Sequence, residues 1–337
     1  MPKDATANSR QQRRLGRLYE TGITRATVLI HEENRANFEV IRPLLRDPRF
    51  AESLSRAARL VAEEGPVNVA QVAQLSPFRY PGGKTWLVPE IRNWLRSRSK
   101  KPAIFAEPFA GGAIASLTVA AEGLAEHVYM TELDEDVSAV WQTIFSEPDW
   151  LSNKIKNFDV THENVLHVIT KKTTSIKEKA FQTIVRNRTQ RGGILAPGAG
   201  LVKKGENGKG LKSRWYPETL AKRIEAIHSL RHKITFTKAD GFDLISRFSK
   251  EPRAAFFIDP PYTAGGKSAG KRLYRLNDIN HCNLFEQAKK VAGEILMTYD
   301  DSEEVRKLAA KHLMKIEEIP MKNTHHALIR ELVITKP

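Results

Sequence analysis

From Pro102 to the C-terminus, short apolar segments alternate with longer segments of helical periodicity. The apolar segments are predicted strands at 103–107, 127–131, 234–238, 254–258 and 294–298. Helices are predicted between and after them at 114–122, 135–145, 217–230, 241–249, 279–292 and 302–312. Strands that alternate with helices favour a parallel sheet, because the crossover helices cover its faces. The pattern predicts a doubly wound, mainly parallel α/β fold, closed by a pair of strands at 314–319 and 327–335.

The tetrapeptide Asp259-Pro260-Pro261-Tyr262 follows the apolar run at 254–258. Neither proline can donate a hydrogen bond to a strand ladder, so the strand ends there. Open α/β sheets bind ligands at the carboxyl ends of their strands, where the tetrapeptide would present an acidic oxygen, free carbonyls and an aromatic ring. These groups suit a flat heterocycle with an exocyclic amine. A strand-terminating turn with a surface tyrosine is the alternative.

The charge balance indicates a polyanionic partner. The 337 residues include 54 Lys and Arg against 39 Asp and Glu, a formal charge of +15, although a merely basic protein is the alternative. Cys282 is the single cysteine, which excludes intrachain disulfides and cysteine-based zinc sites and fits a reducing compartment. The polar start at 1–14 lacks the apolar core of a secretory signal, and no apolar run could cross a bilayer. We expect a cytoplasmic, nucleoid-associated protein with no metal site and no membrane contact.

A basic segment at 149–215 interrupts the alternation. Basic side chains on a glycine-rich backbone, expected to be mobile, suit contact with nucleic-acid phosphates; a solvated surface insertion is the alternative. The candidate DNA-binding residues are Arg186, Arg188, Arg191, Lys203, Lys204, Lys209, Lys212 and Arg214. Arginine forks pair with guanine, so the first three are better placed for base edges, and most of the others should meet phosphates.

Residues 1–75 also differ from the rest of the chain. Asp47-Pro48 starts a helix, apolar positions follow at helical spacing, and Gly65-Pro66 ends the pattern. We expect a helical N-terminal extension that packs on the main domain, with contact to DNA or a partner as the alternative. The predicted catalytic domain then comprises 76–148 and 216–337, with 149–215 inserted.

A glycine turn at 105–112 predicts a cofactor site. In Phe105-Ala106-Glu107-Pro108-Phe109-Ala110-Gly111-Gly112 a strand leads through glycines into a helix, where a ligand can approach the backbone. The spacing is neither that of a dinucleotide fingerprint nor that of a Walker motif. Glu132, at the end of the next strand, is placed to bind both hydroxyls of a ribose. S-adenosylmethionine carries a ribose, needs no phosphate cradle and fits these residues; a plain strand-to-helix turn and a solvated acidic cap are the alternatives.

The motifs occur in a distinctive order. Phe78-Arg79-Tyr80-Pro81-Gly82-Gly83-Lys84 comes first, followed by the glycine turn, Glu132-Leu133-Asp134, the basic insertion and Asp259-Pro260-Pro261-Tyr262. This order resembles that of the Dam-type (α-class, D12) DNA adenine-N6 methyltransferase family, from about Phe78 to the C-terminus. The resemblance implies a Rossmann-like S-adenosylmethionine-dependent methyltransferase sheet, mainly parallel with a reversed last strand. It also implies that 149–215 is the target-recognition region.

The resemblance assigns roles to individual residues. The implied cofactor-binding residues are Tyr80, Gly82, Gly83, Lys84, Glu107, Pro108, Phe109, Gly111, Glu132, Asp240 and Asp259. Lys84 would contact the methionine carboxylate, Glu132 the ribose and Asp240 the adenine amino group. The family usually has Asp at the position of Glu132. The implied catalytic residues are Asp259, Pro260, Pro261 and Tyr262, and Tyr262 would stack on a flipped-out adenine.

The implied activity is site-specific transfer of a methyl group from S-adenosylmethionine to adenine N6 in double-stranded DNA. A cognate restriction endonuclease in the same system is left open as a partner, and we expect a monomer or weak dimer. Methylation of RNA adenine, cytosine N4 or a glutamine amide uses the same tetrapeptide chemistry, and an inactive DNA-binding regulator on this fold is a further alternative. The leading Asp259 and the motif order favour DNA adenine.

Overall fold

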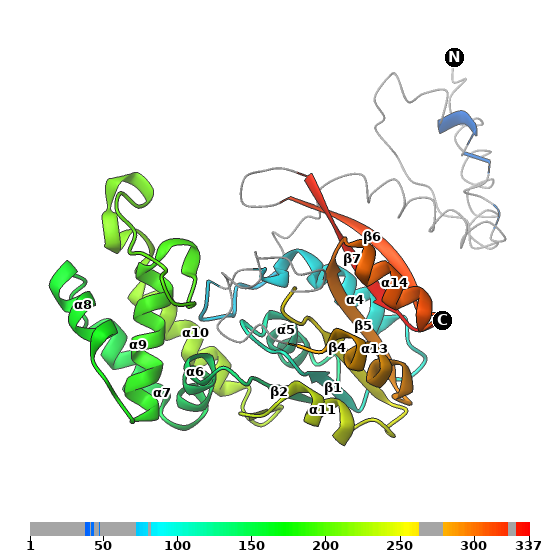
Figure 1. The fold of residues 1–337 in the computed structure, drawn as a ribbon, viewed down its shortest axis with the longest axis horizontal. Coiled ribbons are helices and arrows are strands. Elements are labelled where there is room, and N and C mark those ends of the chain that lie inside the picture. Colours follow the sequence, from blue (N-terminus) through cyan, green and yellow to red (C-terminus); the bar gives the residue numbers. More distant parts are fainter. Residues whose placement is uncertain are drawn as a thin grey trace, which may run out of the picture. The chain divides into compact units, whose positions relative to one another are not determined.

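A computed structural model of the chain describes residues 38–40, 42–43, 47, 72–79, 82–262, 279–322 and 328–337 (Figure 1). The chain divides into two units, Met1–Gly65 and Pro66–Pro337. Nearly all of the first unit lies outside the described residues, and so does most of the predicted helical extension at 1–75.

A seven-stranded sheet forms the centre of the second unit, in the order β3-β2-β1-β4-β5-β7-β6. Its strands are β1 (Ile104–Glu107), β2 (His127–Thr131), β3 (Ile234–Thr237), β4 (Ala254–Ile258), β5 (Glu294–Asp300), β6 (Lys315–Lys322) and β7 (Leu328–Thr335). β1 to β5 pair in parallel, whereas β7 is antiparallel to both of its neighbours. The predicted α/β fold, with a mainly parallel sheet and a reversed last strand, is confirmed.

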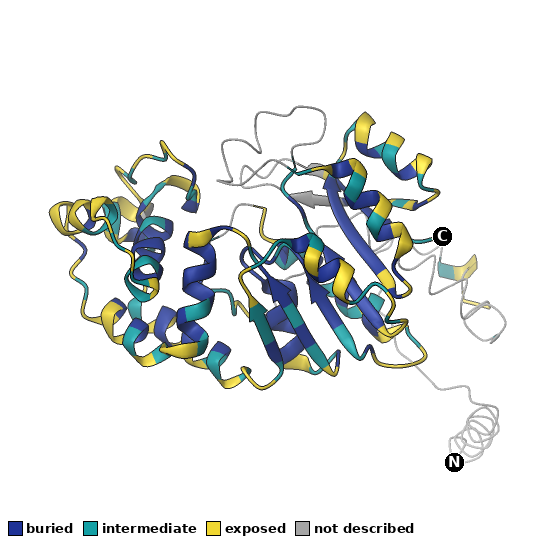
Figure 2. Cartoon of the chain, turned by 60° about the horizontal axis from the view of Figure 1, so that its bottom comes forward, coloured by how far each residue is buried: buried dark blue, intermediate teal, exposed yellow. Residues whose placement is uncertain are grey.

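Helices pack on two apolar cores, one on each face of the sheet. They are α4 (Val88–Arg96), α5 (Ile114–Glu122), α6 (Glu135–Ser146), α10 (Pro217–Ser229), α11 (Gly241–Arg247), α13 (His281–Lys290) and α14 (Glu303–Lys311). Alternate side chains of β4 enter the two cores: Phe257 packs with residues of α4, α5 and α6, and Phe256 with residues of α11, α13 and α14. All of β4 is therefore buried (Figure 2), which explains its uninterrupted apolar sequence. Among the described residues, no helix is long and apolar enough to span a membrane.

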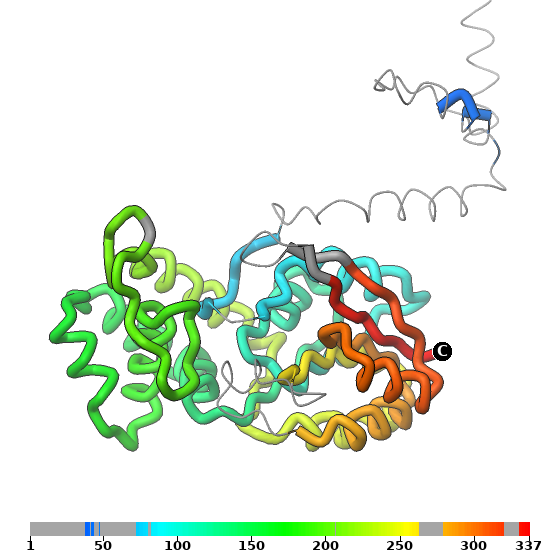
Figure 3. Tube along the Cα trace, turned by 45° about the horizontal axis from the view of Figure 1, so that its top comes forward, coloured from blue at the N-terminus to red at the C-terminus, as the bar shows by residue number. Residues whose placement is uncertain are grey.

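Much of the insertion at 149–215 is helical, which corrects the expectation of a mobile, glycine-rich backbone. It contains α7 (Pro148–Lys156), α8 (His162–Thr170) and α9 (Ile176–Thr189), which lie at the end of the sheet away from β6 and β7 (Figure 3). Phe181, Ile184 and Val185 on α9 are buried at helical spacing. Only the part after α9 is irregular, with single 3₁₀ turns at Arg191–Gly193, Glu206–Gly208 and Gly210–Arg214.

The strand order creates a switch point at the carboxyl ends of β1 and β4, which is where doubly wound sheets have a crevice. The chain moves outward from β1 to β2 and β3, then returns to β4 on the other side of β1, and such a switch point is where doubly wound sheets bind ligands. The loops after β1 and β3 also meet closely there. A Cβ at Gly241 would lie 2.6 Å from the Pro108 carbonyl oxygen and 2.8 Å from the Phe109 ring. Only glycine allows the two loops to approach this closely.

The buried side chain of Glu107 holds the start of α5. Ala113, the residue before the helix, has a left-handed backbone with φ of 50° and makes no side-chain cap. Instead, Glu107 Oε2 accepts a hydrogen bond of 2.9 Å from the backbone N–H of Ser116. Burial raises the pKa of Glu107 to about 8, although the hydrogen bonds from Ser116 oppose the shift. The carboxyl group is therefore mainly protonated at neutral pH.

This raised pKa predicts a pH-dependent contribution to stability. The folded pKa of Glu107, about 8, exceeds the ordinary value of 4.5, so its contribution is complete at low pH and is lost as the pH rises toward 8. For one group, the free energy of unfolding changes by at most about 1.4 kcal/mol per pH unit. Glu107→Gln stays neutral, so its free energy of unfolding relative to wild type should increase between about pH 6 and about pH 8.5. Urea titrations at both pH values measure this, with exposed Glu126→Gln as control. If the free energies of unfolding of Glu107→Gln and wild type differ by the same amount at both pH values, the raised pKa of Glu107 is contradicted.

Candidate active site

Asp259, the first residue after β4, is held from two sides at the crevice. Lys84 Nζ lies 3.0 Å from its Oδ2, and the Thr298 hydroxyl of β5 donates a hydrogen bond of 2.8 Å to its Oδ1. Thr298 is fully buried, whereas about a quarter of the Asp259 side chain (23%) remains exposed. The two donors fix the carboxylate at the sheet edge while one side of it stays accessible. Sequence reasoning did not identify Thr298.

Lys84 is almost completely buried at the start of a 3₁₀ turn, η4 (Lys84–Leu87). Besides Asp259, its ammonium group contacts the Gly82 carbonyl oxygen at 2.8 Å and lies 3.8 Å from Oε1 of Glu331. Gly82 has a φ of 74°, a left-handed conformation that favours glycine. The structure thus brings Lys84 to the Asp259 carboxylate. Its contact with a methionine carboxylate stays a prediction, and Tyr80 lies outside the described residues.

Glu331 is an acidic residue of this site that sequence reasoning missed. It lies on β7, opposite Asp300 of β5 and Ile319 of β6, and its side chain is buried. Burial raises its pKa to about 7; the charge of Lys84 opposes the shift and that of Asp259 adds to it. The segment Arg330-Glu331-Leu332 reads only as part of a strand, and its partners are 247 and 72 residues away in the chain (331 − 84 and 331 − 259).

The aromatic ring of Tyr262 is supported from behind. It stacks on Tyr299 of β5, with ring centroids 5.7 Å apart and planes inclined by 21°. Tyr299 is fully buried, and its hydroxyl pairs with His281 Nδ1 at 2.9 Å. Lys84 Nζ lies 4.9 Å from the Tyr262 ring centroid. The prolines between Asp259 and Tyr262 thus hold a carboxylate and a supported aromatic ring near the same cation.

Glu132 organises the neighbouring end of β2. Its Oε1 accepts from the Asp134 backbone N–H at 2.9 Å and its Oε2 from the Gly111 N–H at 2.8 Å, so the carboxylate joins the loops after β1 and β2. Burial raises its pKa to about 7, and these backbone hydrogen bonds oppose the shift. Asp134 has a different role, because its Oδ1 caps α6 by accepting from the N–H groups of Asp136 and Val137.

Asp240 and Phe109 complete this part of the crevice. Asp240 follows β3 and caps α11 by accepting from the Phe242 N–H at 3.0 Å. The Phe109 ring packs edge-on against Phe242, with centroids 6.3 Å apart, and the Thr131 hydroxyl donates to the Pro108 carbonyl at 2.8 Å. Carboxylate acceptors beside an aromatic face suit ribose hydroxyls and an adenine amino group. This set of acceptors therefore fits the nucleoside part of S-adenosylmethionine.

Two of the predicted base-reading arginines have structural partners instead. Arg188 is buried, its guanidinium donates to the Pro77 carbonyl oxygen, and burial together with the nearby Arg223 lowers its pKa. Arg186 contacts Asp136 Oδ2 at 3.1 Å and donates to the Ile169 carbonyl at 2.8 Å. The prediction that Arg188 reads a base edge is wrong, because the side chain faces the interior from α9. Arg186, on α9, links this helix to α6 through Asp136 and to α8 through Ile169.

The other predicted DNA-binding residues lie in the irregular part of the insertion. Arg191, Lys203, Lys204, Lys209 and Lys212 are exposed, and Arg214 is partly buried. Lys212 Nζ lies 3.4 Å from Asp159 Oδ1, a pairing between two exposed groups that contributes little to stability. The exposed cations remain accessible to a polyanion.

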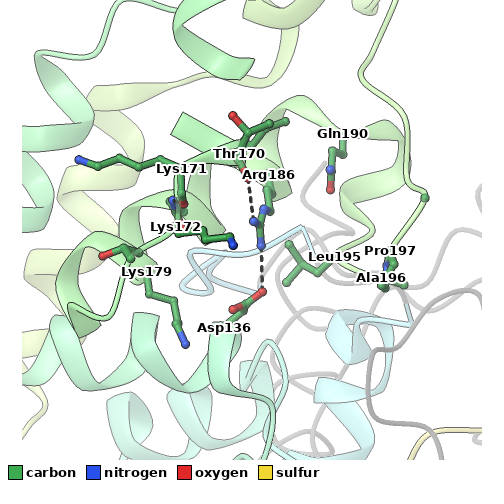
Figure 4. A pocket seen from close by; sticks show the side chains of 14 residues that line it. Asp136, Thr170, Lys171, Lys172, Lys179, Arg186, Gln190, Leu195, Ala196 and Pro197 are labelled. Atoms are coloured by element: carbon green, nitrogen blue, oxygen red, sulfur yellow. Dashed lines mark hydrogen bonds and ion pairs between the residues drawn. The ribbon is translucent and has the colours of Figure 1, made fainter. Parts of the chain in front are cut away.

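A basic pocket of about 510 Å³ lies beside Arg186 (Figure 4). The connection between α8 and α9 supplies Lys171 and Lys172, α9 supplies Lys179, and residues 195–198 form the opposite wall. Asp136 is the one carboxylate among the lining residues. Sequence reasoning missed these lysines, since the segment before α9 contains no glycine to mark it as a loop.

Comparisons with known proteins bear on the identity of this site. A sequence search of curated proteins finds no match. Among solved structures, a SAM-dependent methyltransferase from Agrobacterium tumefaciens has 12% identity and a TM-score of 0.35 over 75% of this chain and 61% of that one. The rRNA methyltransferase AviRa from Streptomyces viridochromogenes has 12% identity and a TM-score of 0.33 over 82% and 91% of the two chains. The B. subtilis tRNA methyltransferase TrmK has 10% identity and a TM-score of 0.33 over 74% and 64%.

A comparison with protein families shows which family the chain belongs to. The model of the D12 class N6 adenine-specific DNA methyltransferases matches residues 80–324, from the Gly82-Gly83-Lys84 segment to just beyond β6. The match contains Glu132, Asp240 and the Asp259 tetrapeptide, which follow β2, β3 and β4 at the carboxyl edge of the parallel strands. The chain therefore belongs to the D12 class N6 adenine-specific DNA methyltransferase family, and S-adenosylmethionine is its cofactor.

Proposed function

We propose that the protein methylates N6 of an adenine in double-stranded DNA. The observation that carries this proposal is the setting of Asp259, whose two oxygens are held by Lys84 and Thr298 at the carboxyl end of β4. Family membership supports DNA adenine as the substrate, and the exposed cations at 191–212 and the basic pocket support a polyanionic partner. The catalytic domain would comprise 76–148 and 216–337, and 149–215 would recognise the target.

The proposed chemistry follows from the weak nucleophilicity of the adenine amine. Its lone pair is delocalised into the ring, so the nitrogen must become pyramidal before it can attack. Asp259 and the Pro260 carbonyl accept the two N6 hydrogens and favour that geometry. Because these acceptors interact most strongly as positive charge grows on N6, they stabilise the transition state more than the ground state. When bound, the cofactor supplies an electrophilic methyl group on a sulfonium whose sulfur retains the bonding electron pair.

The target base must leave the duplex to reach Asp259, since N6 is inaccessible inside the stack. Tyr262 would receive the flipped adenine on the face of its ring that is turned away from Tyr299. Stacking of this kind contributes about 1–3 kcal/mol per base. Tyr299, held by His281, keeps the Tyr262 ring in place, so little side-chain entropy is lost when the base binds.

Asp259→Ala tests the proposed role of the carboxylate. Methyl transfer to duplex DNA should fall by about 100- to 1000-fold, because an acceptor aimed at the developing charge is lost. Binding of S-adenosylmethionine should persist, which calorimetry measures. Asp259→Asn keeps one acceptor oxygen without the charge and should give an intermediate rate. Near-normal turnover by the alanine variant would refute the mechanism, and wild-type activity on RNA but not on duplex DNA would refute the proposed substrate.

Glu132→Ala tests the cofactor site. Loss of the hydrogen bonds to the ribose should raise the dissociation constant of S-adenosylmethionine about 10- to 100-fold, with residual transfer at saturating cofactor. Glu132→Asp is the matched control, because it keeps the carboxylate and should lose less affinity. Calorimetry provides the readout, and thermal melts of each variant check that the contacts with Gly111 and Asp134 have not unfolded the loops. If wild type, Glu132→Ala and Glu132→Asp bind S-adenosylmethionine with equal affinity, Glu132 does not bind the ribose.

Replacement of Lys203 and Lys204 by Gln tests the insertion as a DNA-binding surface. Affinity should fall for every DNA sequence, and the slope of log K against log salt should become shallower by about 1.8, the value for two phosphate contacts. The control is Lys307→Gln/Lys311→Gln on α14, which removes equal charge at the other end of the sheet (Figure 1). If the Lys203/Lys204 variant and the control behave alike, the phosphates lie elsewhere, and Lys171 and Lys172 of the basic pocket are the next pair to replace.

A further inference from the structure

Lys84 is shared between two carboxylates in the interior of the site. Its Nζ lies 3.0 Å from Asp259 and 3.8 Å from Glu331, and the side chains of both Lys84 and Glu331 are less than a tenth exposed. A buried ammonium group is stable only beside compensating charge, and a lysine has three donors to distribute. One goes to the Gly82 carbonyl, which leaves the other two for the carboxylates.

The charge of this cluster depends on Glu331. With Asp259 and Lys84 both ionised, the cluster carries a net charge of −1 when Glu331 is ionised and 0 when it is protonated. If Lys84 is paired with Asp259 alone, its charge offsets that of the carboxylate facing the adenine amine. A second carboxylate draws the ammonium group toward β7 and leaves part of the Asp259 charge uncompensated. Glu331 would thus strengthen Asp259 as an acceptor without touching the substrate.

We propose that Glu331 is a positioning residue for methyl transfer, which divides the charge of Lys84 between two carboxylates and thereby keeps Asp259 an effective acceptor for the cationic N6 nitrogen. The inference rests on the proposed function, since it concerns the same reaction. As the N6 lone pair forms the bond to the methyl carbon, the nitrogen becomes cationic until it releases one of its protons to water. Stabilisation of that charge is the step on which Glu331 acts.

The surroundings of Glu331 make this contribution sensitive to pH near neutrality. The groups that face it are Lys84 from η4, Asp259 and Tyr262 after β4, and Asp300 on β5, whereas β6 presents the apolar Ile319 opposite it. Burial raises the pKa of Glu331 to about 7; Lys84 and the Tyr262 hydroxyl oppose the shift, and Asp259 and Asp300 add to it. The ionised, active form of the cluster therefore forms as the pH rises through about 7.

The test compares single-turnover methylation of duplex DNA by wild type, Glu331→Gln, Glu331→Asp and the control Glu317→Gln, an exposed residue of β6. The wild-type rate should rise by about tenfold in total as the pH passes through about 7, and level off above it. Glu331→Gln should be slower at about pH 8 by about tenfold, lose this rise and keep its KM for DNA. Glu331→Asp should recover part of the rate, and Glu317→Gln should match wild type. A rate for Glu331→Gln that keeps the wild-type pH profile would overturn the proposal.

A measurement without DNA separates this inference from the proposed function. The Glu331 carboxyl resonance, followed by carbon NMR in the free protein, should titrate near pH 7, and in Lys84→Met its pKa should rise because a favourable charge is lost. If Glu331 titrates near pH 7 and its pKa rises in Lys84→Met, but wild type does not methylate DNA, the proposed substrate is wrong. The coupling of Glu331 to Lys84 is then retained. A Glu331 pKa that does not respond to Lys84→Met would overturn the inference even if duplex DNA is methylated.

Discussion

A buried ammonium group must be compensated by nearby charge, and Lys84 meets this requirement with residues from two strands that are distant in sequence. Asp259 follows β4 and Glu331 lies in β7, while Lys84 itself precedes the whole sheet. The three side chains therefore join the beginning, the middle and the reversed strand of the catalytic unit. The position of the Asp259 carboxylate depends on this charge pairing as well as on the turn that the prolines impose.

The sequence predicts the centre of the parallel sheet well because β1, β4 and β5 are buried along most of their length. The apolar run at 254–258 coincides with β4, and the segment at 127–131 coincides with β2. The expectation of a mobile backbone in the insertion was wrong. It rested on the glycines at 192–210 and did not take account of the helical spacing of Phe181, Ile184 and Val185. Once α9 forms, that spacing turns Arg188 into the interior, a consequence that a count of basic residues cannot reveal.

The candidate site was only partly predictable for a similar reason. Asp259, Glu132 and Asp240 follow strands, and the carboxyl ends of parallel strands meet at one edge, so local sequence indicates that they lie close together. Thr298 reaches the same place through the parallel pairing of β5 with β4, in which Met297 lies opposite Ile258. Glu331 reaches it through the antiparallel pairing of β7 with β5, whose register places Glu331 opposite Asp300. An antiparallel register between distant segments leaves no local signal, since each strand reads as apolar with one polar position.

The antiparallel pairing of β7 between β5 and β6 also constrains the order of assembly. β7 follows β5 and β6 in the chain, yet it lies between them in the sheet and brings Glu331 to Lys84. During synthesis the charge cluster at Asp259 is completed only after residue 331 has been made. A nascent chain therefore lacks this pairing of Lys84 with Glu331 until β7 has entered the sheet between β5 and β6.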